Sequence, residues 1–374
     1  MASLPHILPA VAYTSAAQHE RDVAALRRGW HCVGTGQDYA QLHDYRTFDV
    51  MGTGVIVHRT PAGLRAFVNA CAHRHTALTL AAQGHREHLQ CQYHGWEYDA
   101  VGVACRIPDA ACFMPFKYGD FRLEALRVEA LGDLQFITLD PDCQPLAASL
   151  PTEIVSRIAR AFSPTRKQIL SLSINHPCNW KIPIENVLED YHVAMLHQHF
   201  VARHPRLFKF FQGRPPVGEE RYELQAGYTS VKDELGGDSA LYRRAINWVR
   251  SGAEPAFIHT HVFPNLLLGE SGVVGFFQQV FPVSESTSRS LVRMTMDVPA
   301  RGGALGDLAL HAGKRLARLL FDQLMREDGR VFPAVQHGKR STSDDGRLSS
   351  AERRIHAFHC WLQNRGLLSP DSNG

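Results

Sequence analysis

The first half of the chain alternates apolar and polar positions in short runs, which predicts β-strands. Residues 1–42 show a partly helical pattern, for example over residues 18–28. Beyond them, residues 53–69 alternate on either side of a Pro-Ala-Gly turn, and residues 134–139 alternate again. Short, regularly spaced strands are typical of a small antiparallel β unit. The proline-containing stretch at residues 139–151 then predicts a linker.

The second half mixes strand and helix patterns. Its strand candidates span residues 168–174, 260–263, 273–283 and 291–298. Residues 180–199 have the periodicity of one helix, and residues 305–336 that of a long helix, which Pro333 is expected to break. Strands flanked by long helices indicate an α+β fold.

Composition narrows the class of protein. The chain has 374 residues, enough for two or three domains with a sizeable core. Its 40 basic and 37 acidic side chains nearly balance, which argues against a nucleic-acid partner. No apolar run approaches the ~18 residues of a membrane helix, and the first residues lack the basic start of a secretory signal. Eight scattered cysteines suit a reducing compartment, so we expect a cytoplasmic protein. The 21 histidines point to metal chemistry.

Two Cys/His pairs lie in the predicted β unit. They are Cys71-x-His73 and, after a gap of 17 residues, Cys91-x-x-His94. Two thiolates and two imidazoles bind one zinc ion, or they hold a two-iron, two-sulfide cluster with the cysteines on one iron and the histidines on the other. Chance gives about 0.45 pairs of either kind in this composition, so each pair alone is weak evidence. Both pairs together in one short unit indicate a metal site.

A second group of polar residues lies on the helix predicted over residues 180–199. Asn186, Glu189 and His192 are three apart and therefore share one face, where a metal would satisfy them. His197 diverges from His192 by about 140° on a straight helix, so both reach one ion only if the helix ends or bends near His197. His199 returns to the face of His192 and is the rival ligand.

The first pattern, Cys-x-His-Arg followed by Cys-x-x-His-Gly-Trp, resembles the Rieske iron–sulfur motif. The resemblance implies that Cys71 and Cys91 hold the buried iron, and that His73 and His94 hold the outer iron. One position departs from the family pattern, because His75 stands where glycine usually follows the arginine. This change crowds the loop or adds a charge near the cluster, but it removes no ligand.

The second pattern resembles the mononuclear iron site of the Rieske non-haem iron oxygenases. The matching string contains Asn-Trp-Lys, Glu-Asn and Glu-x-Tyr-His-x4-His, which ends at His197. The family uses two histidines, here His192 and His197, and one carboxylate on one side of ferrous iron, and it leaves the other side open for O₂ and substrate. A later Arg-Glu-Asp-Gly string places the third ligand at Asp328, with Glu327 as the alternative.

Glu189 matches an acidic residue that bridges two metal centres across a subunit boundary in this family. A carboxylate between two metal-bound imidazoles can accept an N–H from each. The family implies a homotrimer or a multiple of one, with a small antiparallel β Rieske domain fused to a helix-grip catalytic domain that has a central antiparallel sheet and long helices. The domains expected are an N-terminal helical arm packing on the catalytic domain (1–42), the Rieske domain (43–150) and the catalytic domain (151–374).

The function implied is a terminal oxygenase. The chain lacks a glycine-rich dinucleotide fingerprint, so electrons from NAD(P)H should come through a separate reductase, with or without a ferredoxin. The first expectation is hydroxylation of a small aromatic or apolar substrate. Oxidative N-demethylation or C–N cleavage of a quaternary amine is the alternative. An electron carrier and a zinc-stabilised binding module are alternatives of other classes.

Aromatic residues bear on the choice of substrate. They could line an apolar pocket or cage a quaternary ammonium group. The candidates are Phe200, Leu207, Phe208, Phe210, Phe211, Phe257, Phe263, Phe276, Phe277 and Phe281.

Overall fold

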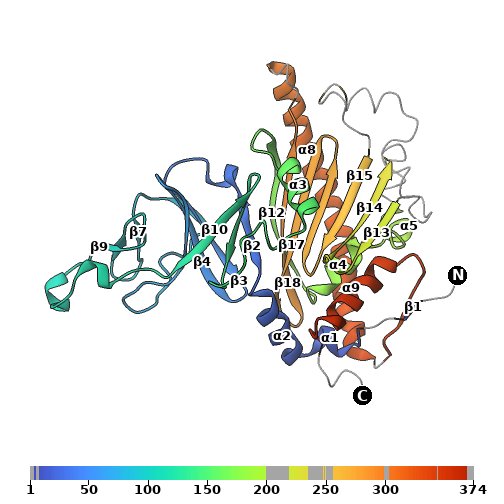
Figure 1. The fold of residues 1–374 in the computed structure, drawn as a ribbon, viewed down its shortest axis with the longest axis horizontal. Coiled ribbons are helices and arrows are strands. Elements are labelled where there is room, and N and C mark those ends of the chain that lie inside the picture. Colours follow the sequence, from blue (N-terminus) through green and yellow to red (C-terminus); the bar gives the residue numbers. More distant parts are fainter. Residues whose placement is uncertain are drawn as a thin grey trace. The chain divides into compact units, whose positions relative to one another are not determined.

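The computed structural model describes residues 4–5, 8–198, 219–234, 247, 249, 256–298, 303–342 and 344–368 (Figure 1). The chain divides into two compact units. Arg27–Val155 form one, which we call the β unit, and Met1–Leu26 with Ser156–Gly374 form the other, which we call the mixed unit. The finer domain ranges expected from the sequence stay predictions. Among the described residues, no helix combines the length and the apolar composition needed to cross a membrane.

The β unit is built on an antiparallel sheet with the strand order β2-β11-β10-β5-β4-β3-β6. A smaller sheet joins β7, β8 and β9. The strands are β2 (Trp30–Thr35), β3 (Asp44–Val50), β4 (Thr53–Thr60), β5 (Gly63–Val68), β6 (Gln83–His85), β7 (Leu89–Gln90), β8 (Glu97–Tyr98), β9 (Ala104–Arg106), β10 (Ala125–Leu131) and β11 (Leu134–Thr138). The short strands predicted within residues 53–69 and 134–139 are confirmed.

Local sequence explains the central hairpin of this unit. Buried β-branched residues at positions 55–57 suit the pleated surface of β4. Gly63 closes the turn into β5 with a φ of 106°, which favours glycine. Ile56, Phe67 and Trp96 belong to one buried cluster with both cysteines of the Cys/His pairs. The predicted metal site therefore lies against the apolar core of the β unit.

The mixed unit carries a second antiparallel sheet, ordered β12-β18-β17-β16-β15-β14-β13 among the described residues (Figure 1). Its strands are β12 (Lys167–His176), β13 (Glu219–Glu223), β14 (Tyr228–Glu234), β15 (Ala256–Val262), β16 (Leu266–Ser271), β17 (Val274–Ser284) and β18 (Thr287–Met296). The helices are α1 (Val11–Thr14), α2 (Ala16–Leu26), α3 (Thr152–Ala161), α4 (Lys181–Val187), α5 (Val193–Leu196), α8 (Ala304–Ser341) and α9 (Arg353–Asn364), and β1 (Leu4–Pro5) pairs with β19 (Arg347–Leu348). This arrangement agrees with the expected α+β fold.

The long helix α8 packs along the sheet, where Phe321 joins Leu170 and Val292 in a buried cluster. The predicted break at Pro333 is wrong, because α8 continues to Ser341. A proline removes one helical hydrogen bond, and tertiary packing can override that loss. Phe332 and Gln336 are both buried on either side of Pro333 and supply such packing.

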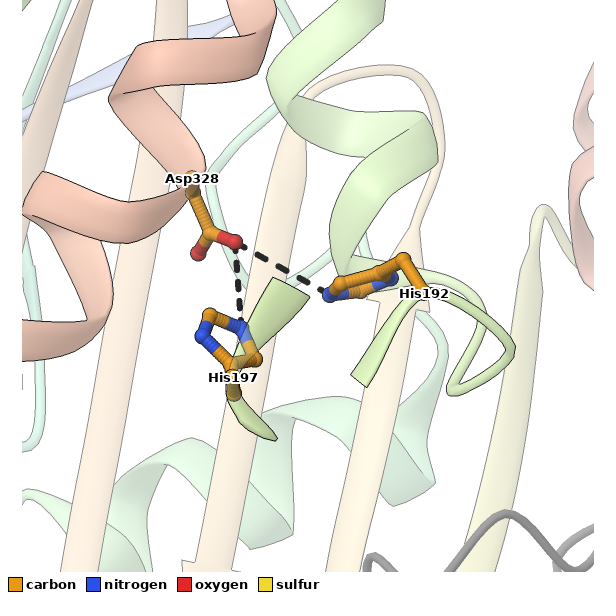
Figure 2. A group of neighbouring side chains, drawn as sticks. All are labelled: His192, His197 and Asp328. Carbon is orange, nitrogen blue, oxygen red and sulfur yellow. Dashed lines mark ion pairs between the residues drawn. The ribbon is translucent and has the colours of Figure 1, made fainter. Parts of the chain in front are cut away.

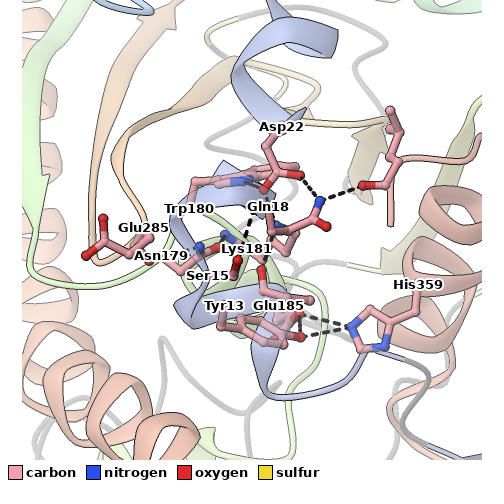
Figure 3. Close-up of polar contacts among 12 residues, drawn as sticks. Tyr13, Ser15, Gln18, Asp22, Asn179, Trp180, Lys181, Glu185, Glu285 and His359 are labelled. Carbon is pink, nitrogen blue, oxygen red and sulfur yellow. Dashed lines mark hydrogen bonds and ion pairs between the residues drawn. The ribbon is translucent and has the colours of Figure 1, made fainter. Parts of the chain in front are cut away.

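A buried polar cluster joins α1 and α2 to α4 and α9 (Figure 3). Lys181 is fully buried and forms an ion pair with Asp22, which also accepts a hydrogen bond from Trp180 Nε1 at 2.8 Å. Beside them, Glu185 accepts a hydrogen bond from Tyr13 Oη at 2.5 Å. These contacts anchor α4, which leads directly into the second group of candidate ligands.

Candidate metal centres

The two Cys/His pairs of the β unit occupy two similar turns. In the first, the His75 N–H donates to the Cys71 carbonyl at 2.8 Å, and in the second the Gly95 N–H donates to the Cys91 carbonyl at 3.0 Å. Both cysteine side chains are buried, whereas His73 is half-buried and His94 is exposed. The two imidazole rings lie next to each other, edge toward face, with centroids 4.7 Å apart. The thiols thus lie inside and the imidazoles outside.

The surroundings of these turns favour metal binding. Trp96 stacks on the His73 ring at 5.0 Å, and Tyr98 Oη lies 3.0 Å from the Cys71 sulfur. Burial raises the pKa of the Cys71 thiol, the Tyr98 hydrogen bond opposes that rise, and nearby Cys91 adds to it. A metal cation would stabilise the thiolates that burial disfavours. His73 Nδ1 is buried and has no hydrogen-bond partner among the described groups, as suits a metal ligand.

His75 marks the departure from the family pattern. Its φ is 60°, in the left-handed region that glycine adopts at low cost. The structure therefore gives a physical reason for the usual glycine. The exposed His75 side chain extends toward solvent, so the backbone accommodates the substitution without displacing a ligand.

The second candidate centre lies within residues 180–199, for which the sequence predicts a single helix. The expectation of one helix over residues 180–199 is wrong, because α4 stops at Val187 and α5 begins at Val193. His192 precedes α5 directly and His197 follows it directly. Their rings converge with centroids 5.4 Å apart, although the two residues would point apart on a straight helix.

Glu189 explains the interruption. Its carboxylate accepts hydrogen bonds from the backbone N–H groups of Tyr191 and His192, an interaction that competes with helix formation. It also bonds Nδ1 of the His192 ring. Asn186, Glu189 and His192 therefore do not share one helical face, and that prediction is wrong. Because Nδ1 donates to the carboxylate, Nε2 of His192 keeps its lone pair for a metal.

Asp328, in α8, completes a group of three residues whose side chains can bind one metal ion (Figure 2). Its Oδ1 lies 3.2 Å from His197 Nε2 and 3.8 Å from His192 Nε2. One ligand atom from each of the three residues lies within 4.8 Å of the others. Asp328 Oδ1 is buried without a hydrogen-bond partner among the described residues, which is costly unless a cation is bound. Two imidazoles and one carboxylate suit ferrous iron.

Glu327 has a different place from its neighbour. Its Oε2 accepts a hydrogen bond from His197 Nδ1 at 2.7 Å, and its Oε1 accepts one from Gln323 Nε2 at 2.7 Å. Burial lowers the pKa of His197, but the carboxylates of Asp328 and Glu327 outweigh it and raise that pKa overall. Glu327 therefore supports a candidate ligand. The sequence offered Glu327 only as an alternative ligand and gave no signal of this supporting role.

The phenylalanines considered for the substrate pocket include residues on both faces of the sheet of the mixed unit. Phe276 packs near Phe321 of α8, with ring centroids 6.2 Å apart, whereas Phe277 packs near Phe162 on the other face. His199, the rival ligand, lies outside the described residues, as do the five candidates at positions 200 and 207–211.

Comparison with known proteins identifies the family. Residues 166–366, more than half of the chain, match the family model of the ring hydroxylating alpha subunit (catalytic domain). The chain belongs to this family. Residues 29–124 match the Rieske [2Fe-2S] domain. The chain is therefore the terminal subunit of a Rieske oxygenase, with a [2Fe-2S] cluster and a mononuclear non-haem iron as its cofactors. A pure electron carrier or a zinc-stabilised module would not need the catalytic part of this family.

Relatives of known activity align with much of the chain. The chloroplastic choline monooxygenase of Beta vulgaris is 25% identical over 364 residues, which cover 95% of this chain and 76% of the relative. The carnitine monooxygenase oxygenase subunit of Escherichia coli K12 is 28% identical over 344 residues, 89% of this chain and 84% of the relative. The anthranilate 1,2-dioxygenase large subunit of Burkholderia cepacia is 30% identical over 203 residues, 51% of this chain and 47% of the relative.

Solved structures share the fold. The quaternary ammonium Rieske monooxygenase CntA in complex with L-carnitine has a TM-score of 0.74 at 20% identity, covering 97% of this chain and 99% of that one. Naphthalene 1,2-dioxygenase with indole bound has a TM-score of 0.75 at 18% identity. This match covers 91% of this chain and 83% of that one. Both confirm a Rieske β domain combined with a catalytic α+β domain.

Proposed function

We propose that this oxygenase oxidises a quaternary amine at a carbon bound to nitrogen, using O₂ and electrons from a separate reductase. The observation that carries the proposal is the extent of alignment with its relatives. The choline monooxygenases of Beta vulgaris and Arabidopsis thaliana and the carnitine monooxygenase of Escherichia coli K12 align over 89–95% of the chain. Anthranilate dioxygenase aligns over 51%, as does the carnitine monooxygenase of Acinetobacter pittii. This favours the quaternary-amine alternative over the aromatic or apolar substrate expected first.

In this proposal the two metal centres use the residues predicted from the sequence. Cys71, Cys91, His73 and His94 hold the cluster, while His192, His197 and Asp328 hold the iron. When bound, the cluster supplies electrons one at a time and the ferrous ion is the place where O₂ reacts. The residues around them orient the ligands, since Glu189 and Glu327 each accept the Nδ1 proton of a histidine and leave its Nε2 lone pair facing Asp328.

Glu189 has a second role in the proposal. In a head-to-tail homotrimer, its carboxylate also accepts an N–H from His73 or His94 of the neighbouring copy. Glu189 would then connect the cluster ligand of one copy to His192 of the next, on the path of electrons that a separate reductase, with or without a ferredoxin, would supply. We place the reaction in the cytoplasm, with neither a nucleic acid nor a membrane as partner.

The sheet face beneath α8 suits an onium group. Phe276 and Phe321 pack there in one apolar cluster, and in this proposal they attract the quaternary ammonium cation, as aromatic rings do. His176 on β12 packs edge-on against Phe332, whose position in α8 is one turn beyond Asp328. Burial lowers the pKa of His176 to about 4, with the Asp328 charge opposing the shift, so this imidazole is neutral at pH 7 and does not repel a cation.

The products distinguish the possible reactions. Hydroxylation of an N-methyl group consumes one O₂, two electrons and two protons, and it releases one water. The resulting N-hydroxymethyl group breaks down to formaldehyde and a tertiary amine. Hydroxylation at the nitrogen-bound carbon of the longer substituent of a trimethylammonium substrate instead gives an intermediate that breaks down to trimethylamine, a carbonyl compound and a proton. Formaldehyde and trimethylamine therefore report which carbon is oxidised.

The deciding experiment measures O₂ and NADH consumption by the enzyme reconstituted with a Rieske-type reductase. Choline, carnitine and other quaternary amines are compared with anthranilate and related aromatic acids, and the His192→Ala variant serves as the inactive control. Amine-dependent O₂ uptake with matching product is the expected result. Turnover of an aromatic acid to a diol, with none of any quaternary amine, would overturn the proposal in favour of ring hydroxylation, for which the anthranilate dioxygenase match is the support.

A further inference from the structure

We infer that Gln336 is a positioning residue for the iron centre. Its side-chain amide holds α8, which carries Asp328, against the start of α4, which leads into the two histidines. The inference rests on the ligand set proposed above. Gln336 contacts none of those ligands, so it acts through the placement of the two elements that supply them.

The ligands come from elements that do not fix each other directly. His192 and His197 flank α5, which has only four residues, whereas Asp328 lies in the 38-residue helix α8. A helix of one turn is not stable alone and takes its geometry from its surroundings. The separation of the imidazoles from the Asp328 carboxylate must therefore be set by contacts between α8 and the segment that leads to α5.

Gln336 supplies such a contact with both ends of its amide. It is 4% exposed, its Oε1 accepts the Asn179 N–H at 2.7 Å, and its Nε2 donates to the Tyr13 carbonyl at 3.0 Å. Asn179 lies two residues before α4. One side chain of α8 thus holds the entry to α4 and the helix α1.

Asn179 also connects the start of α4 to the sheet. Its side chain donates to the Glu285 carbonyl in the β17–β18 turn at 3.1 Å and accepts the Lys181 N–H at 3.1 Å (Figure 3). The entry to α4 is therefore fixed to the sheet on one side and to Gln336 of α8 on the other. Asn179, Lys181 and Gln336 are all buried, and their hydrogen bonds restrict movement of α4 at this junction.

The Gln336 contact matters because Pro333 removes a hydrogen bond from α8 nearby. This proline lies between Asp328 and Gln336, and it has no N–H to donate to the carbonyl of Gly329. Helices bend most readily where a hydrogen bond is missing. Packing of Phe321 on the sheet holds α8 before this gap, and Gln336 holds it after the gap. Without the amide, the last turns can pivot and the entry to α4 moves relative to Asp328.

The chemistry of the side chain makes the inference testable. Leucine at position 336 removes the hydrogen bonds that Gln336 makes to the Asn179 N–H and to the Tyr13 carbonyl. Glutamate keeps the acceptor for Asn179 but has no donor for Tyr13. We therefore expect Gln336→Leu to weaken iron binding by about tenfold or more, the size of effect seen when support of a metal ligand is lost, and Gln336→Glu to have a smaller effect.

The experiment uses the full chain with its cluster assembled. Iron(II) affinity is measured by titration, and site geometry by the EPR signal of the nitric oxide adduct. The visible spectrum of the cluster should not change. Asn265→Leu is the matched control, because Asn265 is also a buried amide of the mixed unit, but it donates to the Val280 carbonyl at 2.8 Å and contacts neither α4 nor α8 in the described structure. It should lower the melting temperature but leave iron affinity and EPR signal unchanged.

Two outcomes separate the possible failures. Gln336→Leu with wild-type iron affinity and EPR signal, and only a lower melting temperature, would overturn the positioning role. If Gln336→Leu does not fold, Gln336→Glu decides the question by the same two measurements. His197→Ala must abolish iron binding in the same assay. If it does not, the proposed ligand set is wrong, and that failure is distinct from a failure of the Gln336 inference.

Discussion

Replacing Glu327 with glutamine removes one negative charge beside His197, and the Gln323 amide has to turn its oxygen toward the new NH2 group. Glu327 Oε2 lies 2.7 Å from His197 Nδ1, and the two side chains are only 10% and 5% exposed. Glutamine has the same length and can still accept this hydrogen bond through its carbonyl oxygen. The bond then joins neutral partners, so the His197 ring keeps its orientation but becomes a weaker electron donor to a metal.

The expected magnitude follows from that difference. Removing the outer partner of a metal-bound histidine weakens metal binding by about 10–100-fold, or about 1.4–2.7 kcal/mol. Glu327→Gln keeps the geometry and loses only the charge, so we expect the lower end, about tenfold weaker iron(II) binding. The assay is iron(II) titration against a competing chelator at pH 7, with the absorption spectrum of the Rieske cluster as an internal reference.

A second variant on the same helix controls for the loss of charge. Asp322 is paired with exposed Arg318 at 2.8 Å, so Asp322→Asn removes one charge from α8 without removing a contact to a candidate ligand. It should bind iron(II) like the unmodified protein. Equal affinities for Glu327→Gln and the unmodified protein would refute the reasoning, provided that Asp328→Asn abolishes binding in the same titration.

Three further predictions concern electron transfer and stability. Glu189→Gln should keep the sulfide content of its cluster but, assayed with iron(II) in excess, lose at least about tenfold in substrate-dependent O₂ uptake, and unchanged turnover would exclude the proposed electron route. Lys181→Met leaves Asp22 buried without its cation, so chemical denaturation should show a loss of about 3–5 kcal/mol, part of which Asp22→Asn restores in the double variant. Burial lowers the pKa of His31 to about 4, below the ordinary value near 6.5 of the unfolded chain. The unfolded state therefore takes up the proton first as pH falls, and unfolding measured from pH 7 to pH 4 should show about 3 kcal/mol of stability lost below pH 6.5. A His31→Asn variant with an undiminished pH dependence would contradict this assignment.

The sequence predicted those features whose signals are local. The short strands around residues 53–69 follow from alternation and a turn, and the Cys/His pairs are recognisable because each pair lies within four consecutive positions. The positive φ of His75 also agrees with the family preference for glycine there. In each case the residues that decide the structure are neighbours in the chain.

The features that were missed depend on contacts from far along the chain. A three-residue spacing of polar groups predicted one helical face, but the Glu189 carboxylate binds the backbone and ends that pattern. Asp328 was expected as the third ligand only through the resemblance to the family, because Asp328 and Glu327 point about 100° apart on α8 and the rotation of the helix decides which one faces the imidazoles. Buried Phe332 and Gln336 fix that rotation, and no local pattern encodes it.

The single turn of α5 has a consequence for engineering this enzyme. His192 and His197 stand at its two ends, so inserting or deleting one residue between them would swing one imidazole by about 100° and displace it by about 1.5 Å along the axis. Neither change can be absorbed by a side-chain rotation alone. Libraries aimed at new substrates can therefore vary exposed residues of this stretch, such as Met195, but they should keep buried Val193 and the same number of residues.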